Sequence, residues 1–270
     1  MQRDFQHNLP FMGLEEVWSI FTDWRYDPLS LWMGLPFSFT LLTILLMHEL
    51  GHYIACVHYR LSASLPYFLP APVLIGTFGA FIRIRSPLHS RKALFDVSFA
   101  GPAAGFLFLI PALGIGLALS KIVPGIGLEH QIHFGTPALL WIAQTIVFPG
   151  VPDQDIYLHP VARAATIGLL ATAWNLIPIG QLDGGHILYS IAGNVHRRLS
   201  LVFIAALIPL GIQFWPGWLA WAVLLFFVRR HPPVYDTSPL GHQRKKLAWV
   251  AAILFALSFT VAPFQDVSGF

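Results

Sequence analysis

Long apolar runs separated by short polar segments dominate the hydrophobic pattern of this chain. A run of about twenty apolar residues is long enough to cross a bilayer as a helix. We predict such spans at 35–59, 94–119 and 161–179, a helical hairpin at 199–228 that turns near residue 216, and a last span at 247–261. The pattern therefore predicts an all-α polytopic membrane protein with about six transmembrane helices.

A different pattern fills residues 65–85, between the first two predicted spans. Pro66 and Pro70 interrupt any helix there, and residues 73–85 are rich in the β-branched and aromatic side chains that favour strands. Non-helical backbone at membrane depth is tolerated where protein or a watery cavity shelters it. We predict a re-entrant β-loop; a loop lying on the lipid headgroups is the alternative.

The composition agrees with a membrane protein. The chain of 270 residues is 56% apolar and 11% charged, with a mean hydropathy of +0.64, whereas soluble domains carry roughly a quarter charged residues. Cys56 is the only cysteine, which excludes a disulfide scaffold. The net charge of +3 does not indicate nucleic-acid binding, because the basic residues form small clusters between apolar runs. The expected environment is a lipid bilayer.

The distribution of Lys and Arg predicts the orientation of the chain. Twelve of the 16 fall in one set of loops and four in the other. Because cytoplasmic loops carry an excess of basic residues, we expect the first set in the cytoplasm and both termini outside. The first set is Arg60, Arg83, Arg85, Arg91, Lys92, Arg197, Arg198, Arg229, Arg230, Arg244, Lys245 and Lys246, and the second is Arg3, Arg25, Lys121 and Arg163.

The first predicted span contains the sequence His48-Glu49-Leu50-Gly51-His52. On a helix, positions four apart share a face, so both imidazoles can bind one ion with Glu49 beside them. Imidazole nitrogens are good zinc ligands, and an adjacent carboxylate can act as a general base. The alternative is a set of polar residues that only bond one another between helices. Ionisable groups within a span are costly, however, and as a rule they are functional.

Asp183 is the predicted third ligand. A catalytic zinc site needs three protein ligands and an open position for water, and Asp183 follows the cytoplasmic end of the third span, at a depth similar to that of Glu49. One Asp and one Glu also make a site with Zn²⁺ formally neutral, which lowers the cost of burying it. Asp-Gly-Gly is typical of turns too, so a turn carboxylate is the alternative. We predict one zinc ion per chain.

These two motifs resemble those of the site-2 protease family of intramembrane zinc metalloproteases. The resemblance rests on His48-Glu-Leu-Gly-His52 in one span and on Asn175-x-x-Pro178-x-x-x-Leu182-Asp183-Gly184 at the end of another, and it covers about residues 36–190. Further segments, at 66–70, 76–80 and 180–185, resemble the photosynthetic-lineage branch of the family and its bacterial relatives.

The resemblance implies an activity and a role for each matching residue. The protein would hydrolyse a peptide bond within or near the transmembrane segment of a single-span membrane protein, with His48, His52 and Asp183 binding zinc and Glu49 as the general base. Asn175 would orient the substrate or stabilise the oxyanion. The strand that pairs with the substrate would include Gly76, Thr77, Phe78 and Gly79. His186, which follows the Asp-Gly-Gly sequence, is a candidate for lining the site.

The chain is therefore expected to have three regions and one location. Residues 1–34 would form an amphipathic segment on the outer interface, residues 35–190 a three-span zinc protease core with the re-entrant loop at 65–85, and residues 191–270 the helical hairpin and the last span. The expected location is the plasma membrane of a bacterium, with the active site toward the cytoplasm. The sequence does not predict an oligomeric state.

Two other functions stay open at this point. A non-catalytic membrane chaperone or pseudoprotease could share the same fold, although such a protein has no need of Glu49. A membrane di-iron oxygenase also uses His-x-x-x-His clusters. Such a site needs many more histidines on one side of the membrane than His48, His52 and His186.

Overall fold

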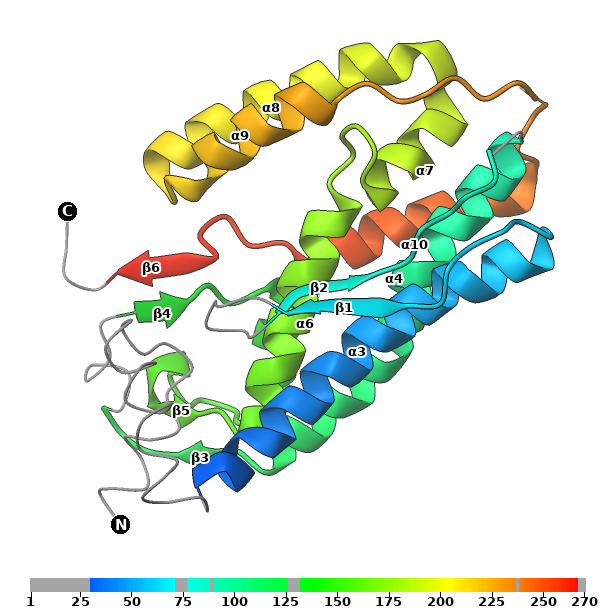
Figure 1. Ribbon diagram of the computed structural model, residues 1–270. Helices are drawn as coiled ribbons and strands as arrows, with labels where there is room; N and C mark the ends of the chain where they lie inside the picture. The colour runs from blue at the N-terminus through cyan, green and yellow to red at the C-terminus, as the bar shows by residue number, and fades with distance from the viewer. Residues whose placement is uncertain (1–29, 71–76, 88–89, 126–131, 237, 267–270) are drawn as a thin grey trace.

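The computed structural model describes residues 30–70, 77–87, 90–125, 132–236 and 238–266, which are mostly helical (Figure 1). The α-helices are α3 (Ser30–His58), α4 (Arg91–Ala118), α5 (Ala138–Val147), α6 (Pro160–Leu176), α7 (Asp183–Ala192), α8 (His196–Gln213), α9 (Gly217–Val228) and α10 (His242–Ser258). The strands are β1 (Tyr67–Pro70), β2 (Thr77–Phe81), β3 (Lys121–Ile122), β4 (Ile132–Phe134), β5 (Ile156–Tyr157) and β6 (Phe264–Asp266). Short 3₁₀ turns, η2 (Asp153–Asp155) and η3 (Gly193–Val195), precede β5 and α8.

A helix occupies the position of every predicted span. The predicted hairpin is present as α8 and α9, which separate at residues 214–216. By length and composition, α3 from Gly34 onward and α4 are long and apolar enough to cross a membrane. The prediction of a mainly helical protein with membrane-spanning candidates is thus confirmed at this level. The predicted interfacial segment at 1–34 lies almost entirely outside the described residues.

Helices α3, α4 and α6 pack closely around a shared core of Ile44, Leu109 and Leu169. Glycine makes this approach close: a Cβ atom at Gly51 of α3 would lie only 2.3 Å from the Ala100 carbonyl oxygen of α4. Small residues at helix contacts let two backbones come this near in a membrane protein. The segment of α3 that carries the two histidines is therefore pressed directly against α4.

A charged cluster joins the C-terminal end of α3 to α4 and α10. Arg244 of α10 donates from Nε and Nη2 to the two carboxylate oxygens of Asp96 in α4, at 2.8 and 2.7 Å. The Tyr59 hydroxyl, just after α3, also donates to Asp96. Bidentate, charge-assisted bonds of this kind fix relative orientation as well as distance. The cluster therefore holds in place the helix end nearest to His52.

Strands β1 and β2 form an antiparallel hairpin that runs beside α3 (Figure 1). Tyr67 pairs with Phe81 and Phe68 with Ala80, and a further bridge joins Ala63 to Ile84. The strand-and-turn character predicted for residues 65–85 is therefore present. Of the residues singled out there, Gly76 lies outside the described part of the chain, and Thr77, Phe78 and Gly79 belong to β2.

Two small sheets were not expected from the sequence. β3 pairs with β5, and β4 pairs with β6, so that the end of the described chain returns to the connection between α4 and α6. These strands are two or three residues long, too short to produce an alternating pattern of apolar and polar residues. The all-α expectation holds for the helices and misses these strands, of which β3 and β5 lie near the start of α3 (Figure 1).

Candidate metal centre

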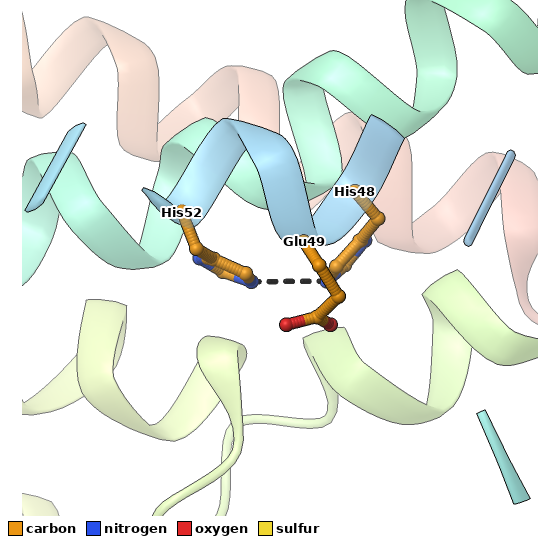
Figure 2. Close-up of side chains that lie close together, drawn as sticks. All are labelled: His48, Glu49 and His52. Carbon is orange, nitrogen blue, oxygen red and sulfur yellow. Dashed lines mark hydrogen bonds between the residues drawn. The ribbon is translucent and has the colours of Figure 1, made fainter. Parts of the chain in front are cut away.

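Helix α3 places His48 and His52 side by side, as their spacing of four residues predicts (Figure 2). Their Nε2 atoms lie 3.0 Å apart, and the two rings meet edge to face at 72°. Both side chains are buried, with residue exposures of 5% and 7%. Two ring nitrogens thus point at one small volume inside the protein.

Asp183 reaches the same volume from the start of α7. Its Oδ2 atom lies 3.2 Å from His48 Nε2 and 3.3 Å from His52 Nε2. The two glycines that follow let α7 begin here, because a Cβ atom at Gly184 would lie 2.0 Å from the Leu176 carbonyl oxygen, and one at Gly185 would lie 2.5 Å from the carbonyl oxygens of Ile179 and Gly180. The Asp-Gly-Gly sequence therefore serves close packing against α6 and the loop after it, and it aims the carboxylate at the histidines.

The three atoms have the spacing that a zinc ion requires. A tetrahedral zinc ion with ligand bonds of about 2.0–2.1 Å holds its ligand atoms about 3.3 Å apart, close to the observed 3.0, 3.2 and 3.3 Å. His52 Nδ1 lies 2.8 Å from the Val97 carbonyl oxygen, which can only accept, so Nδ1 carries the proton and Nε2 keeps its lone pair for a metal. The donor set fits zinc.

Glu49 lies beside the two histidines on α3 and is also buried (Figure 2). Ligand atoms of His48, Glu49 and His52 lie within 4.8 Å of one another, so these three residues form a group that could hold a metal ion. The Asp183 oxygen lies closer to both imidazoles than this limit. The backbone amide of Ile82 lies beside the Glu49 carboxylate.

The remaining predicted site residues divide into two groups. Asn175, in the last turn of α6, lies at the site, with Nδ2 3.5 Å from His48 Nε2. Thr77 and Gly79 shape the hairpin turn instead: the Gly79 N–H donates to Thr77 Oγ1 at 3.0 Å, and that hydroxyl donates to the Leu69 carbonyl oxygen at 2.9 Å. In the described part of the chain, no side-chain bond joins Thr77 or Gly79 to the metal-binding residues.

His186 lies one turn into α7 and bonds away from the ligand set. Its Nδ1 atom lies 2.7 Å from His231 Nε2, and His231 Nδ1 lies 2.6 Å from the Pro232 carbonyl oxygen. Since a carbonyl only accepts, His231 carries its proton on Nδ1 and His186 donates from its own Nδ1. Burial, with a smaller effect of His231, lowers the pKa of His186 to about 4. His186 is therefore neutral at pH 7, with Nε2 unprotonated.

Sequence reasoning missed three contributors to the site. The Val97 carbonyl oxygen fixes the His52 ring, the Ile82 amide lies beside Glu49, and Gly101 makes room for His52. A Cβ atom at Gly101 would lie 2.1 Å from His52 Nε2. The run of small residues at 100–105 was a usable signal for a close helix contact. Backbone donors and acceptors leave no mark on the sequence at all.

We predict that Gly101→Ala weakens zinc binding although Gly101 is not a ligand. The new methyl group would displace the His52 ring, and losses of this indirect kind typically lower metal affinity about 10–100-fold. Zinc affinity is measured by competition with a chromophoric chelator. Gly114→Ala is the matched control, because a Cβ atom at that position of α4 meets nothing within 4 Å. Equal affinities in the two variants would show that the His52 ring is not held against Gly101.

Comparison with known proteins gives one family and several relatives. A sequence profile described as "Peptidase family M50" matches residues 36–215. "Probable zinc metalloprotease EGY1, chloroplastic" of Arabidopsis thaliana is 31% identical over 244 residues, which cover 86% of this chain and 43% of that protein. "Probable zinc metalloprotease EGY2, chloroplastic" of the same plant is 34% identical over 210 residues, covering 74% of this chain and 36% of that protein. The chain thus spans less than half the length of these relatives.

Proposed function

Because the chain belongs to peptidase family M50, the site-2 protease family, we propose that it is an intramembrane zinc metalloprotease that hydrolyses a peptide bond within or near the transmembrane segment of a single-span membrane protein. The observation that carries this proposal is the convergence of His48, His52 and Asp183 on one buried point, with a free carboxylate on the same helix turn. Burying a carboxylate next to three donors of the kind that bind zinc costs free energy, and a carboxylate in this position can act as the base in hydrolysis.

The residues around this point have different roles in the proposed reaction. A zinc ion held by His48, His52 and Asp183 would act as a Lewis acid toward the scissile carbonyl. Glu49 takes a proton from the attacking water and passes it to the leaving nitrogen, and the backbone amide of Ile82 lies beside its carboxylate. Asn175, whose Nδ2 lies 3.5 Å from His48 Nε2, would donate to the oxyanion that develops.

The free edge of β2 offers the substrate a strand to pair with. The Ser64 N–H donates to the Arg83 carbonyl oxygen at 2.9 Å, and the Arg85 N–H to the Ser62 carbonyl oxygen at 2.7 Å. Since backbone groups point to opposite edges at alternate residues, Ile82 faces the other way, where its N–H meets Glu49. A substrate strand added at that edge would pass directly beside the general base.

The membrane arrangement is part of the same proposal. Helices α3 and α4 are the spans with support from length and composition, and α6, α8, α9 and α10 would complete the six, with the β1–β2 hairpin as a re-entrant loop. The division of the 16 Lys and Arg residues supports an active site toward the cytoplasm and both termini outside. We propose the plasma membrane of a bacterium as the location.

Purification in detergent, metal analysis and cleavage of a panel of single-span peptides test the function directly. We expect one zinc ion per chain, and cleavage that a chelator abolishes and added zinc restores. A di-iron oxygenase would instead contain two irons per chain. A pseudoprotease would bind zinc and cleave none of the peptides.

We predict that Ala80→Pro slows cleavage of a helical substrate more than that of a substrate already unwound by helix-breaking residues. A substrate helix must open before hydrolysis, and main-chain bonds to the β2 edge satisfy its freed groups. By alternation from Ile82, the Ala80 N–H lies on this edge, and proline removes it. Ala80→Gly, which keeps the N–H, is the control, and zinc content should not change. If the proline variant slows cleavage of both substrates by the same factor relative to the parent, strand pairing at this edge is excluded.

A further inference from the structure

We infer that Arg83 and Arg85 form a binding site for acidic side chains of the substrate, next to the bond that is cleaved. The inference rests on the proposed function and adds a substrate preference to it. Its basis is that Arg83 and Arg85, which have no ion-pair or hydrogen-bond partner for their guanidinium groups among the described residues, continue the strand whose edge reaches Glu49. It also requires that this strand be regular as far as residue 85.

The hairpin does extend beyond the end of β2. The bridge between Ala63 and Ile84 and the backbone bonds of Arg83 and Arg85 to the opposite arm carry the pairing two to four residues past Phe81. A second tie, from the Arg83 N–H to Ser64 Oγ at 2.8 Å, fixes this part of the hairpin. The two arginines therefore stand on a hydrogen-bonded ribbon and not on a loose loop.

Alternation along the ribbon puts the two arginines on its exposed face. Phe81, Arg83 and Arg85 are exposed, whereas Ala80 is buried and Ile82 and Ile84 are partly covered. Neither guanidinium has an ion-pair or hydrogen-bond partner among the residues that the structure describes. Within the described part of the chain, no carboxylate is therefore paired with these two neighbouring positive charges.

The contact between Ile82 and Glu49 fixes where the substrate backbone would lie. The general base marks the scissile bond, and the backbone amide of Ile82, the residue that follows β2, lies beside its carboxylate. A substrate strand continuing along this edge next passes Arg83 and then Arg85. Opposite charges on neighbouring strands of a sheet attract when they share a face, and like charges repel. Acidic residues within about four positions of the scissile bond, on the flank that passes the arginines, would therefore be favoured.

A lipid role for the two arginines is the competing explanation. Both lie in the loop set that we place in the cytoplasm, where basic residues also contact anionic headgroups. Headgroup binding would not depend on the substrate sequence, whereas a substrate contact would. The experiment below therefore varies peptide charge and lipid charge independently.

The test measures peptide binding to the full chain in lipid nanodiscs, using the Glu49→Gln variant as a non-cleaving background. The peptides are variants of one single-span sequence. In the first set, two Asp, two Asn or two Lys residues stand on one flank of the cleaved bond. In the second set, the same pairs stand on the other flank. Discs contain phosphatidylcholine alone or with phosphatidylglycerol. Each peptide is compared in the parent, in Arg83→Glu/Arg85→Glu and in the control Arg197→Glu/Arg198→Glu, which reverses two exposed charges at the start of α8.

We expect the parent to bind the Asp peptide about tenfold more tightly than the Lys peptide, on one flank only, and the Arg83→Glu/Arg85→Glu variant to reverse that order. The α8 control should keep the order of the parent. If charge reversal weakens all peptides equally, or acts only in discs with phosphatidylglycerol, the arginines bind lipid and the inference is wrong. Failure of the Glu49-containing protein to cleave any peptide would count against the proposed function, while the binding order would still decide the inference.

Discussion

Glu49→Gln is expected to abolish proteolysis while the protein still binds one zinc ion per chain. Glutamine has nearly the same shape, so His48, His52 and Asp183 keep their geometry, but it cannot accept a proton from water at neutral pH. General base catalysis contributes roughly 10²–10⁴-fold to a rate, and the fall in kcat should be about 10³-fold or more.

Single-turnover cleavage and metal analysis on the same preparation measure the two effects separately. Asp153→Asn is a suitable control, because it makes the same change of charge at an exposed carboxylate in η2, far from the site in sequence. Loss of zinc together with activity in Glu49→Gln would make Glu49 a metal ligand. The group His48, Glu49 and His52 would then be the true donor set.

The local part of the site could be predicted from the sequence because a helix converts spacing into geometry. Positions 48 and 52 are one turn apart, and the apolar run around them predicts the helix, so their Nε2 atoms had to come close. Glu49 is one residue after His48, so by the same rule its side chain leaves the helix on a neighbouring face, beside the two histidines. The motif thus encodes a base and two ligands within five residues.

The contacts between distant segments could not be predicted in this way. The Ile82 amide meets Glu49 because the hairpin runs along α3, and the His52 ring is fixed by Val97 because α3 and α4 are in contact. A backbone amide or carbonyl is present at nearly every residue, so no residue type marks these positions. The strands β3 to β6 were missed for a related reason: they depend on pairing between segments far apart in the chain.

The position of Asp183 could be predicted from the sequence only in part. The sequence allowed either a turn or a metal ligand, and Asp-Gly-Gly alone does not decide between them. What decides is packing: Gly184 and Gly185 leave room for α7 to start against the end of α6, and that start points the carboxylate at α3. The hydrophobic pattern predicts the helices but not the angle at which two of them meet.

The three ligand variants, His48→Ala, His52→Ala and Asp183→Ala, should each lose zinc and activity together, which separates them from Glu49→Gln. A catalytic zinc site has three protein ligands, and removing one leaves two, too few to hold the ion against a chelator. His58→Ala is the matched control, since His58 lies on the same helix and is exposed. Zinc content after dialysis and cleavage of one single-span peptide are measured for all four proteins.

Asp183 gives the sharpest result of this series, because it is the ligand that the tertiary structure supplies. Its Oδ2 atom lies almost equally far from the two imidazole nitrogens, at 3.2 and 3.3 Å, so its loss opens one full side of the site. Asp183→Asn keeps the side-chain volume and removes the negative charge, and we expect it to bind zinc more weakly than the parent and more strongly than Asp183→Ala. If Asp183→Ala keeps a full zinc ion, Asp183 is not a ligand and its carboxylate serves only to orient the two histidines.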